Sequence, residues 1–221
     1  HPATANPAQQ DAQRQAAQQQ PRTLSRPETT TPTQQQPLAA APARDATRAI
    51  MAKRLDELEA TTVEVAGLHE AAPTSPALRE SYVRCLESSC TGAFNGDLLE
   101  AGRGYLETLA ALALAADGPP ESRAAYARSL YAGVRCLTRT GGAKDAEPML
   151  AELEKRWVAD GKDSAASLHY GLGLRSTLDA YRKAGDAPAG KRTADRIRAL
   201  LVAEADNLAL RLAMKGALDD D

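Results

Sequence analysis

The chain has 221 residues, of which 43% are hydrophobic and only 4% aromatic, and its formal net charge is −2. This composition argues against a β-sheet core, which needs β-branched and aromatic side chains, and favours an all-α protein whose core consists of Ala and Leu. The even charge balance argues against a general nucleic-acid binder. No apolar run approaches the ~18–20 residues that span a bilayer, so we expect no transmembrane segment.

Residues 1–44 are rich in Gln and Pro. This segment contains ten Gln and seven of the thirteen Pro, and Leu24 and Leu38 are its only large apolar residues. It cannot bury enough apolar surface to offset its chain entropy, so we predict a disordered tail that serves as a linker, or alternatively as a tether or export leader. Because the chain begins with His1, we expect an exported protein (periplasmic or secreted) rather than a cytoplasmic one, or else a chain whose start has been removed.

The pattern changes at Asp45, where an all-helical domain of residues 45–221 is predicted to begin. A 4-3-4-3-4 spacing places six residues on one face of a leading helix over 45–72: Met51, Leu55, Leu58, Thr62, Val65 and His69. Pro73 ends this helix, and Ser75 with Pro76 forms a start signal for the next one. Further helices are predicted over 97–116, 122–140, 145–159, 164–184 and 189–218, with short turns between them.

The turns reveal an internal repeat. Their glycines, Gly96, Gly141 and Gly185, lie 45 and 44 residues apart. A small residue follows five positions after each glycine: Ala101, Ala146 and Gly190. A left-handed Gly ends the first helix of a hairpin, and the small residue then lets the second helix pack closely against it. The sequence therefore predicts helical hairpins over residues 76–218.

These hairpins resemble the tetratricopeptide repeat (TPR), most clearly in two groups of residues: Tyr181, Gly185, Asp186 and Gly190, and Gly96, Asp97, Ala101 and Tyr105. The resemblance covers roughly residues 76–216 and implies antiparallel hairpins stacked as a short TPR-like α-solenoid. The period is about ten residues longer than the ~34 of that repeat, which implies longer helices. Gly92 and Ala194 stand where the repeat has larger residues.

The resemblance also implies a binding site, because the first helix of each TPR hairpin lines a concave groove that binds extended peptides. Counted from the turn glycines, this face comprises Arg128, Tyr131, Arg135 and Thr138 in the second hairpin, Leu172, Arg175, Asp179 and Arg182 in the third, and Val83, Leu86, Cys90 and Ala93 in the first. The two later sets follow a 3-4-3 spacing and so each form one helical stripe. Arg side chains bind carboxylates in bidentate fashion, so we expect an acidic peptide or a free carboxyl terminus as the partner.

No group of residues indicates catalysis or a metal site. His69 and His169 stand alone, neither lies in a nucleophile motif, and the three Cys match no zinc pattern. We therefore expect no catalytic residue, no metal ligand and no cofactor. Four glycines lie within helical patterns and lack the residues of a phosphate loop, and we interpret them as sites of close packing: Gly102, Gly104, Gly171 and Gly173.

Two further features have a structural interpretation. Six basic residues gather towards the C-terminus: Arg182, Lys183, Lys191, Arg192, Arg196 and Arg198. Without aromatic stacking partners they are typical of an exposed helix face with mixed charge rather than of an anionic-ligand or nucleic-acid site. We interpret Cys85, Cys90 and Cys136 as small buried thiols on helix faces. A disulfide between Cys85 and Cys90 is the alternative, and it requires that their helix ends near Ser88.

The sequence thus predicts a non-enzymatic protein-interaction module, a scaffold that binds a protein or peptide in a helical groove. One alternative is an assembly subunit that packs against copies of the same chain, with the Met51–His69 face as its self-association surface. Another is an enzyme whose site is not recognisable from one sequence, although no paired carboxylates or triad stand out.

Overall fold

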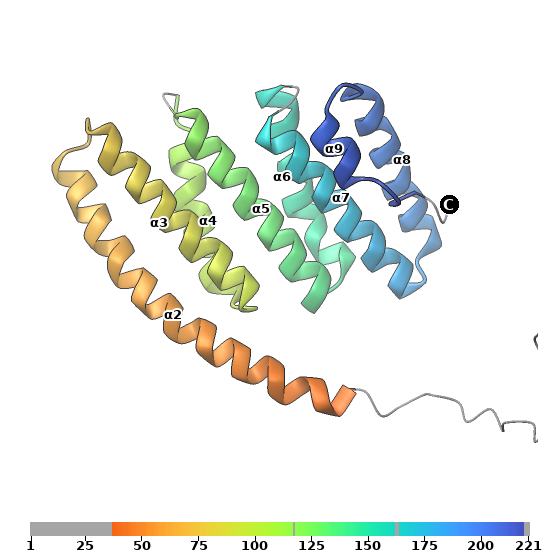
Figure 1. Ribbon diagram of the computed structural model, residues 1–221, viewed down its shortest axis with the longest axis horizontal. Helices are drawn as coiled ribbons and strands as arrows, with labels where there is room; N and C mark the ends of the chain where they lie inside the picture. The colour runs from red at the N-terminus through yellow and green to blue at the C-terminus, as the bar shows by residue number, and fades with distance from the viewer. Residues whose placement is uncertain (1–36, 117, 162–163, 219–221) are drawn as a thin grey trace, which may run out of the picture. The chain divides into compact units, whose positions relative to one another are not determined.

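The computed structural model describes residues 37–116, 118–161 and 164–218 (Figure 1). Residues 1–36, for which the sequence predicts a disordered tail, lie outside these ranges. Helices and no strands occur within them, which confirms the all-α prediction. The helices are α2 (Pro37–Ala71), α3 (Pro76–Asn95), α4 (Leu99–Ala113), α5 (Pro120–Thr140), α6 (Ala143–Asp160), α7 (Ala165–Ala184), α8 (Ala187–Ala203) and α9 (Leu208–Ala213).

Helix α2 begins at Pro37 rather than at the predicted residue 45. Pro is favoured in the first turn of a helix, and the residues that follow are rich in Ala, the strongest helix former. The chain divides into two compact units, His1–Ala39 and Ala40–Asp221.

Within the unit Ala40–Asp221, helices α3 to α8 form antiparallel hairpins that stack in chain order (Figure 1). The first helices of the hairpins, α3, α5 and α7, pack side by side. Helix α4 packs against α3 and α5, α6 packs against α5 and α7, and α8 packs against α7. This arrangement is compatible with a helical-repeat fold, and it leaves one face of α5 and α7 free of the second helices.

The turns between the hairpin helices are not equivalent. A left-handed glycine is present at Gly185, whose φ is 71°, but Gly96 and Gly141 have φ values of −86° and −108°. In the first turn the left-handed residue is Asp97, with a φ of 60°. The prediction is therefore wrong by one position in the first two turns, because in the second turn the positive φ falls on Gly142 (117°) and not on Gly141. In the first turn the Gly96 N–H still bonds to the Gly92 carbonyl and continues the helical path.

The core is built from Leu, Ala and a few aromatic side chains. Phe94, the single Phe, is fully buried where α3, α4 and α5 meet. A Cβ atom on Gly102 of α4 would come within 2.5 Å of Phe94 Cε1, and one on Gly133 of α5 within 3.2 Å of Phe94 Cζ. The close packing predicted at Gly102 is thus confirmed, whereas the same prediction is wrong for Gly104, where a Cβ atom would meet no atom within 4 Å.

Helix α2 packs against α3 through its predicted face. Leu55 and Thr62 are buried, and Thr62 Oγ1 lies 3.2 Å from Ser89 Oγ of α3. The rings of His69 and Tyr82 lie 5.6 Å apart, measured between their centroids. Leu58, Val65 and His69 of the same face are half-buried, and self-association through this face stays a prediction.

The prediction of one continuous helix over 189–218 is wrong, because the chain breaks between α8 and α9. The Glu204 carboxylate accepts a hydrogen bond of 2.7 Å from Trp157 Nε1, and Asn207 Oδ1 caps α9 by accepting the Leu210 N–H at 3.0 Å. Asn is a favoured N-cap residue, so the sequence held a signal for this break. The turn brings α9 back against α7. No helix in the described ranges has both the length and the apolarity needed to cross a membrane.

Candidate functional site

Helices α5 and α7 each present a stripe of polar side chains on the face that their neighbours leave uncovered. On α5, Arg128 and Arg135 are exposed, whereas Tyr131 and Thr138 are half-buried. On α7, Asp179 is exposed, and Leu172, Arg175 and Arg182 are half-buried. The residues between these positions on both helices face the core. The helical spacing that predicted the two stripes therefore describes their exposure correctly.

A groove of about 750 Å³ lies between the C-terminal ends of α5 and α7. It brings together three of the predicted residues, Thr138 from α5 and Asp179 and Arg182 from α7. Residues from these two helices and the turn after α5 complete its lining: Arg139, Gly142, Ala143, Ser176, Ala180, Lys183 and Ala184. We call this cavity the α5–α7 groove. Ser176 was not singled out from the sequence, and Lys183 was interpreted only as part of an exposed helix face with mixed charge.

Beside the groove, three side chains form a stack. The Arg135 guanidinium lies over the Tyr131 ring, 5.9 Å from its centroid, and the Tyr131 ring stacks on His169 of α7 with centroids 5.6 Å apart. Burial, and next the positive charge of Arg128, lowers the pKa of His169 to about 4. His169 is therefore neutral at pH 7 and serves as a flat stacking partner. Its Nδ1 atom is buried without a hydrogen-bond partner in the described part of the chain.

The four arginines of the stripes have different partners. Arg128 makes a bidentate ion pair with Glu87 of α3, with distances of 2.5 and 2.8 Å. Arg175 and Arg182 donate hydrogen bonds to the main-chain carbonyls of Ala213 and Ala217, at 2.5 and 3.0 Å. Within the described ranges, only Arg135 among the four makes no side-chain hydrogen bond or ion pair. Among the arginines of the two stripes, Arg135 is therefore the one whose guanidinium is available to a ligand.

The predicted face of the first hairpin is wrong. Val83, Leu86, Cys90 and Ala93 are all buried in the core and cannot contact a partner. The α3 residues one position later, Arg84, Glu87 and Thr91, are exposed or half-buried, and Glu87 reaches Arg128 on the same face. The face that was counted from Gly96 therefore lies in the core, whereas the same count from Gly141 and Gly185 gives exposed or half-buried residues.

The cysteines are free thiols. Helix α3 runs unbroken through Cys85 and Cys90, so the helix end that a disulfide between them requires is absent. Burial raises the pKa of Cys90 to about 12, and its thiol donates to the Gly102 carbonyl at 3.3 Å. Burial also raises the pKa of Cys136. Both buried cysteines therefore act as small core side chains, as the sequence favoured.

The basic stretch near the C-terminus does not form one cationic patch. Arg196 binds Glu147 and Glu154 of α6 at 3.1 and 3.0 Å. Lys191 and Arg198 both pair with Asp195 of their own helix. These contacts hold α8 to α6 and α7 and place mixed charges on α8, in agreement with the structural interpretation.

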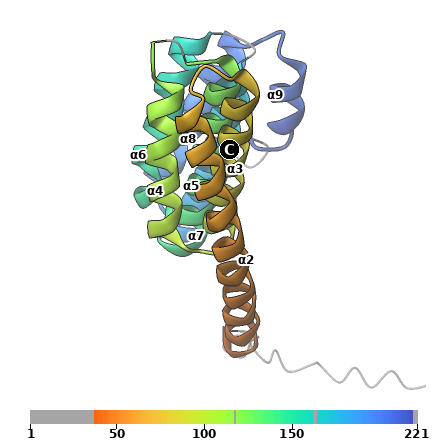
Figure 2. The ribbon, with the colours of Figure 1, turned by 90° about the vertical axis from the view of Figure 1, so that its left-hand side faces the viewer.

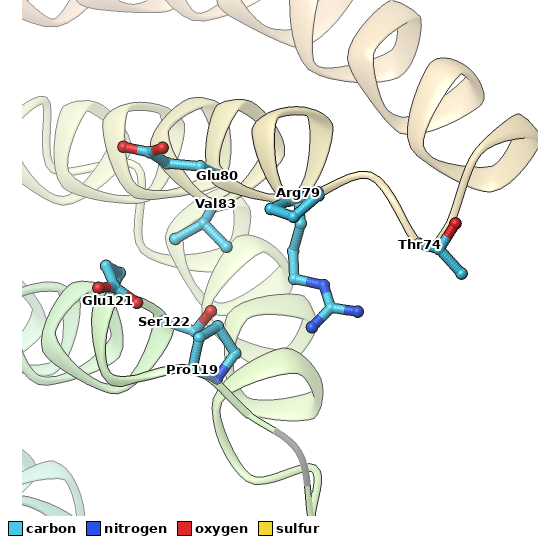
Figure 3. Close-up of a pocket in the computed structure, with 8 residues that line it drawn as sticks. Thr74, Arg79, Glu80, Val83, Pro119, Glu121 and Ser122 are labelled. Carbon is cyan, nitrogen blue, oxygen red and sulfur yellow. The ribbon is translucent and has the colours of Figure 1, made fainter.

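A second cavity, of about 350 Å³, lies between the starts of α3 and α5 (Figure 3). Arg79 and Glu80 of α3 line it opposite Glu121 and Ser122 of α5. The buried Ser122 Oγ has no hydrogen-bond partner among the described residues, and no histidine lines the cavity. Nothing there resembles a nucleophile with its base. The described ranges also hold no group of three or more His, Cys, Asp or Glu that could bind a metal ion.

Comparison with protein-family models, with curated proteins and with solved structures finds no match for this chain. Similarity to a known protein therefore supplies no function. The geometry of the α5–α7 groove and of the stack beside it is the basis on which a function is inferred.

Proposed function

We propose that this chain is a non-enzymatic, TPR-like interaction module that binds an acidic peptide of a partner protein along the α5–α7 groove. The observation that carries the proposal is the groove itself. It lies between the first helices of two neighbouring hairpins, and Thr138, Asp179 and Arg182 from both predicted stripes line it. A groove between repeat helices is the kind of surface on which an extended peptide contacts several helices at once.

The charges of the groove favour an acidic ligand. Its lining carries three cations, Arg139, Arg182 and Lys183, and one carboxylate, Asp179. Arg139 binds Asp97 and the Phe94 carbonyl, and Arg182 binds the Ala217 carbonyl, so Lys183 and the neighbouring Arg135 are the cations left for a ligand. Both are exposed, so their attraction to ligand carboxylates is screened within about 10 Å at 0.1 M salt. We expect binding that weakens as the salt concentration rises.

The stack beside the groove supplies an anchor. Tyr131 is held between the neutral His169 ring and the Arg135 guanidinium. Tyr, Trp and Arg are enriched among the few residues that dominate the binding free energy at protein interfaces, and Tyr buries a large area with few rotatable bonds. The stack therefore positions Arg135 to bind a carboxylate while Tyr131 contacts an apolar part of the same peptide.

A displayed library of random 12-residue peptides tests the proposal with the full chain as bait. We expect the wild type to enrich sequences rich in Asp and Glu. The double variant Arg135→Glu with Lys183→Glu should lose this enrichment. The double variant Lys53→Glu with Arg54→Glu, which makes the same charge change at exposed positions of α2, should keep it.

The enriched peptides are then synthesised and their dissociation constants measured at two salt concentrations. A fall in affinity of at least tenfold in the Arg135/Lys183 variant, with the wild-type fold retained, would support the groove. Equal affinity for the two double variants would show that the peptides bind elsewhere and would reject the assignment.

A further inference from the structure

The segment that follows α8 lies against α7 as a separate element. After the turn at residues 204–206, Asn207 caps α9, and the chain continues past it to Leu218, with Gly216 at a φ of 76°. We call Asn207–Leu218 the C-terminal segment. Figure 2 shows α9 outside the stack of hairpins, and α7 is the helix against which it packs. The segment thus covers α7 on a side that the hairpin helices leave open.

Three apolar side chains of the segment are buried, Leu210, Met214 and Ala217, and Ala213 and Leu218 pack against the same core. Leu210 is fully buried and Met214 is almost fully buried. Leu210 fills a hollow that exists because Gly171 has no side chain: a Cβ atom there would overlap with Leu210 Cδ1 and would lie 3.6 Å from Met214 Cε. The hollow is therefore filled by the branched side chain of Leu210 and, one helical turn later, by the flexible side chain of Met214.

The polar contacts are made mainly with the main chain of the segment. Arg175 donates to the carbonyl of Ala213, the last residue of α9, and Arg182 donates to the carbonyl of Ala217. At the start of the segment, Asn207 Nδ2 donates to Ser167 Oγ at 3.1 Å. The Ala213 carbonyl lies at the end of α9, where carbonyls lack partners within the helix and carry a partial negative charge, whereas the Ala217 carbonyl lies in the turn that follows. Both contacts are made to main-chain oxygens and do not select a particular side chain.

The outer side of α9 is apolar as well. Leu208 and Leu212, one helical turn apart, are 68% and 63% exposed. The segment therefore buries two large apolar residues of α9 and its following turn against α7 while it presents two leucines to solvent. Helix α9 has only six residues and packs mainly against one helix, α7, and short elements with few neighbouring elements open locally more often than the whole domain unfolds.

We infer that α7 carries a docking site for a short amphipathic helix, formed by Ser167, Gly171, Arg175 and Arg182, and that the C-terminal segment is its exchangeable occupant. An incoming helix with Leu and Met-like residues four apart, followed by a small residue at its end, takes the place of the segment. This site lies beside the α5–α7 groove, shares Arg182 with it, and binds a different class of ligand. It does not depend on the acidic peptide.

A fluorescent synthetic peptide of residues 206–218 serves as the probe, and its anisotropy is measured with the full chain. In the variant Leu210→Asp with Met214→Asp the resident segment no longer fits the hollow. We expect this variant to bind the probe at least tenfold more tightly than the wild type, whose own segment competes. A probe with Asp in place of its Leu210 should bind neither protein. Adding Arg175→Gln and Arg182→Gln to the variant should weaken its binding again.

A folded Leu210/Met214 variant that fails to bind the probe would overturn the inference. If that variant does not fold, hydrogen exchange of the wild type decides the matter. Exchange of the residue 208–214 amides at least tenfold faster than that of the α7 amides supports an exchangeable segment. Exchange of both sets at one common rate shows that the segment is a fixed part of the fold and rejects the inference. Neither readout involves an acidic peptide, so the proposed function stands or fails separately.

Discussion

Gly171 of α7 and Leu210 of α9 are in such close contact that the glycine position has no room for even one methyl group. The added Cβ would also lie 3.3 Å from Leu200 Cδ2, so neighbours on two sides enclose the site. The docking of the C-terminal segment therefore depends on the absence of a side chain on α7.

The variant Gly171→Val tests this dependence. Overpacking a filled site lowers stability by about 1–3 kcal/mol, and here the strain falls on Leu210. We expect amide exchange over residues 208–214 to become at least tenfold faster while exchange in α3 and α5 stays unchanged. The matched control is Gly104→Val on α4, where a Cβ meets no atom within 4 Å. Equal effects of the two substitutions would contradict the assigned contact.

Phe94 is the side chain whose loss should destabilise the hairpin stack most. It is fully buried and contacts the positions of Gly102 and Gly133 on two other helices. Replacing a buried Phe by Ala removes apolar burial and leaves a cavity, which together lower the free energy of unfolding by about 3–5 kcal/mol. Urea denaturation of Phe94→Ala measures this loss. A loss below about 1 kcal/mol would show that the ring does not hold α3, α4 and α5 together.

His169 should make the protein sensitive to mild acid. Its pKa in the folded protein is about 4, below the ordinary value of 6.5, so the unfolded chain binds a proton that the folded chain does not. Stability is unaffected above pH 6.5 and falls as the pH drops from 6.5 towards 4. Between pH 7 and pH 4.5 the loss from this residue is about 2 kcal/mol. The variant His169→Phe keeps a ring against Tyr131, cannot titrate, and should lose that part of the pH dependence in urea denaturation.

A substitution of Arg128 tests the cause of the lowered pKa of His169. The charge of Arg128 lowers the pKa of His169, whereas that of Glu87 raises it. In Arg128→Ala the lowering charge is gone and Glu87 remains, so the pKa of His169 should rise. An NMR titration measures it, with the signal assigned by its disappearance in His169→Phe. A pKa unchanged by Arg128→Ala would leave burial as the only cause.

The thiols should react in two classes. Cys85 is half-buried, whereas Cys90 and Cys136 are buried and burial raises the pKa of each, which suppresses the reactive thiolate. We expect a thiol reagent to modify one cysteine quickly in the native protein and all three after denaturation. The variant Cys85→Ser should lose the fast phase. Only one reactive thiol after denaturation would reveal a disulfide and contradict the unbroken course of α3.

The sequence by itself determined the helical class, the hairpin order and the two stripes on α5 and α7. The physical reason is that these features depend on local patterns: a 3.6-residue period, turn glycines, and proline at helix starts. The interpretation of Gly102 as a packing site also required only the knowledge that glycine within a helix is otherwise unfavourable.

Only the tertiary structure decided the features that depend on contacts between distant residues. The left-handed residue of the first turn is Asp97 rather than Gly96, and the predicted α3 face of Val83, Leu86, Cys90 and Ala93 lies in the core. The pairing of Arg128 with Glu87 joins residues 41 positions apart, which no local pattern contains. Likewise, the break before Asn207 brings the C-terminal segment back against α7, where its carbonyls accept hydrogen bonds from Arg175 and Arg182. Which charges remain for a partner is therefore set by how the helices pack, because packing brings residues together without regard to their distance in the chain.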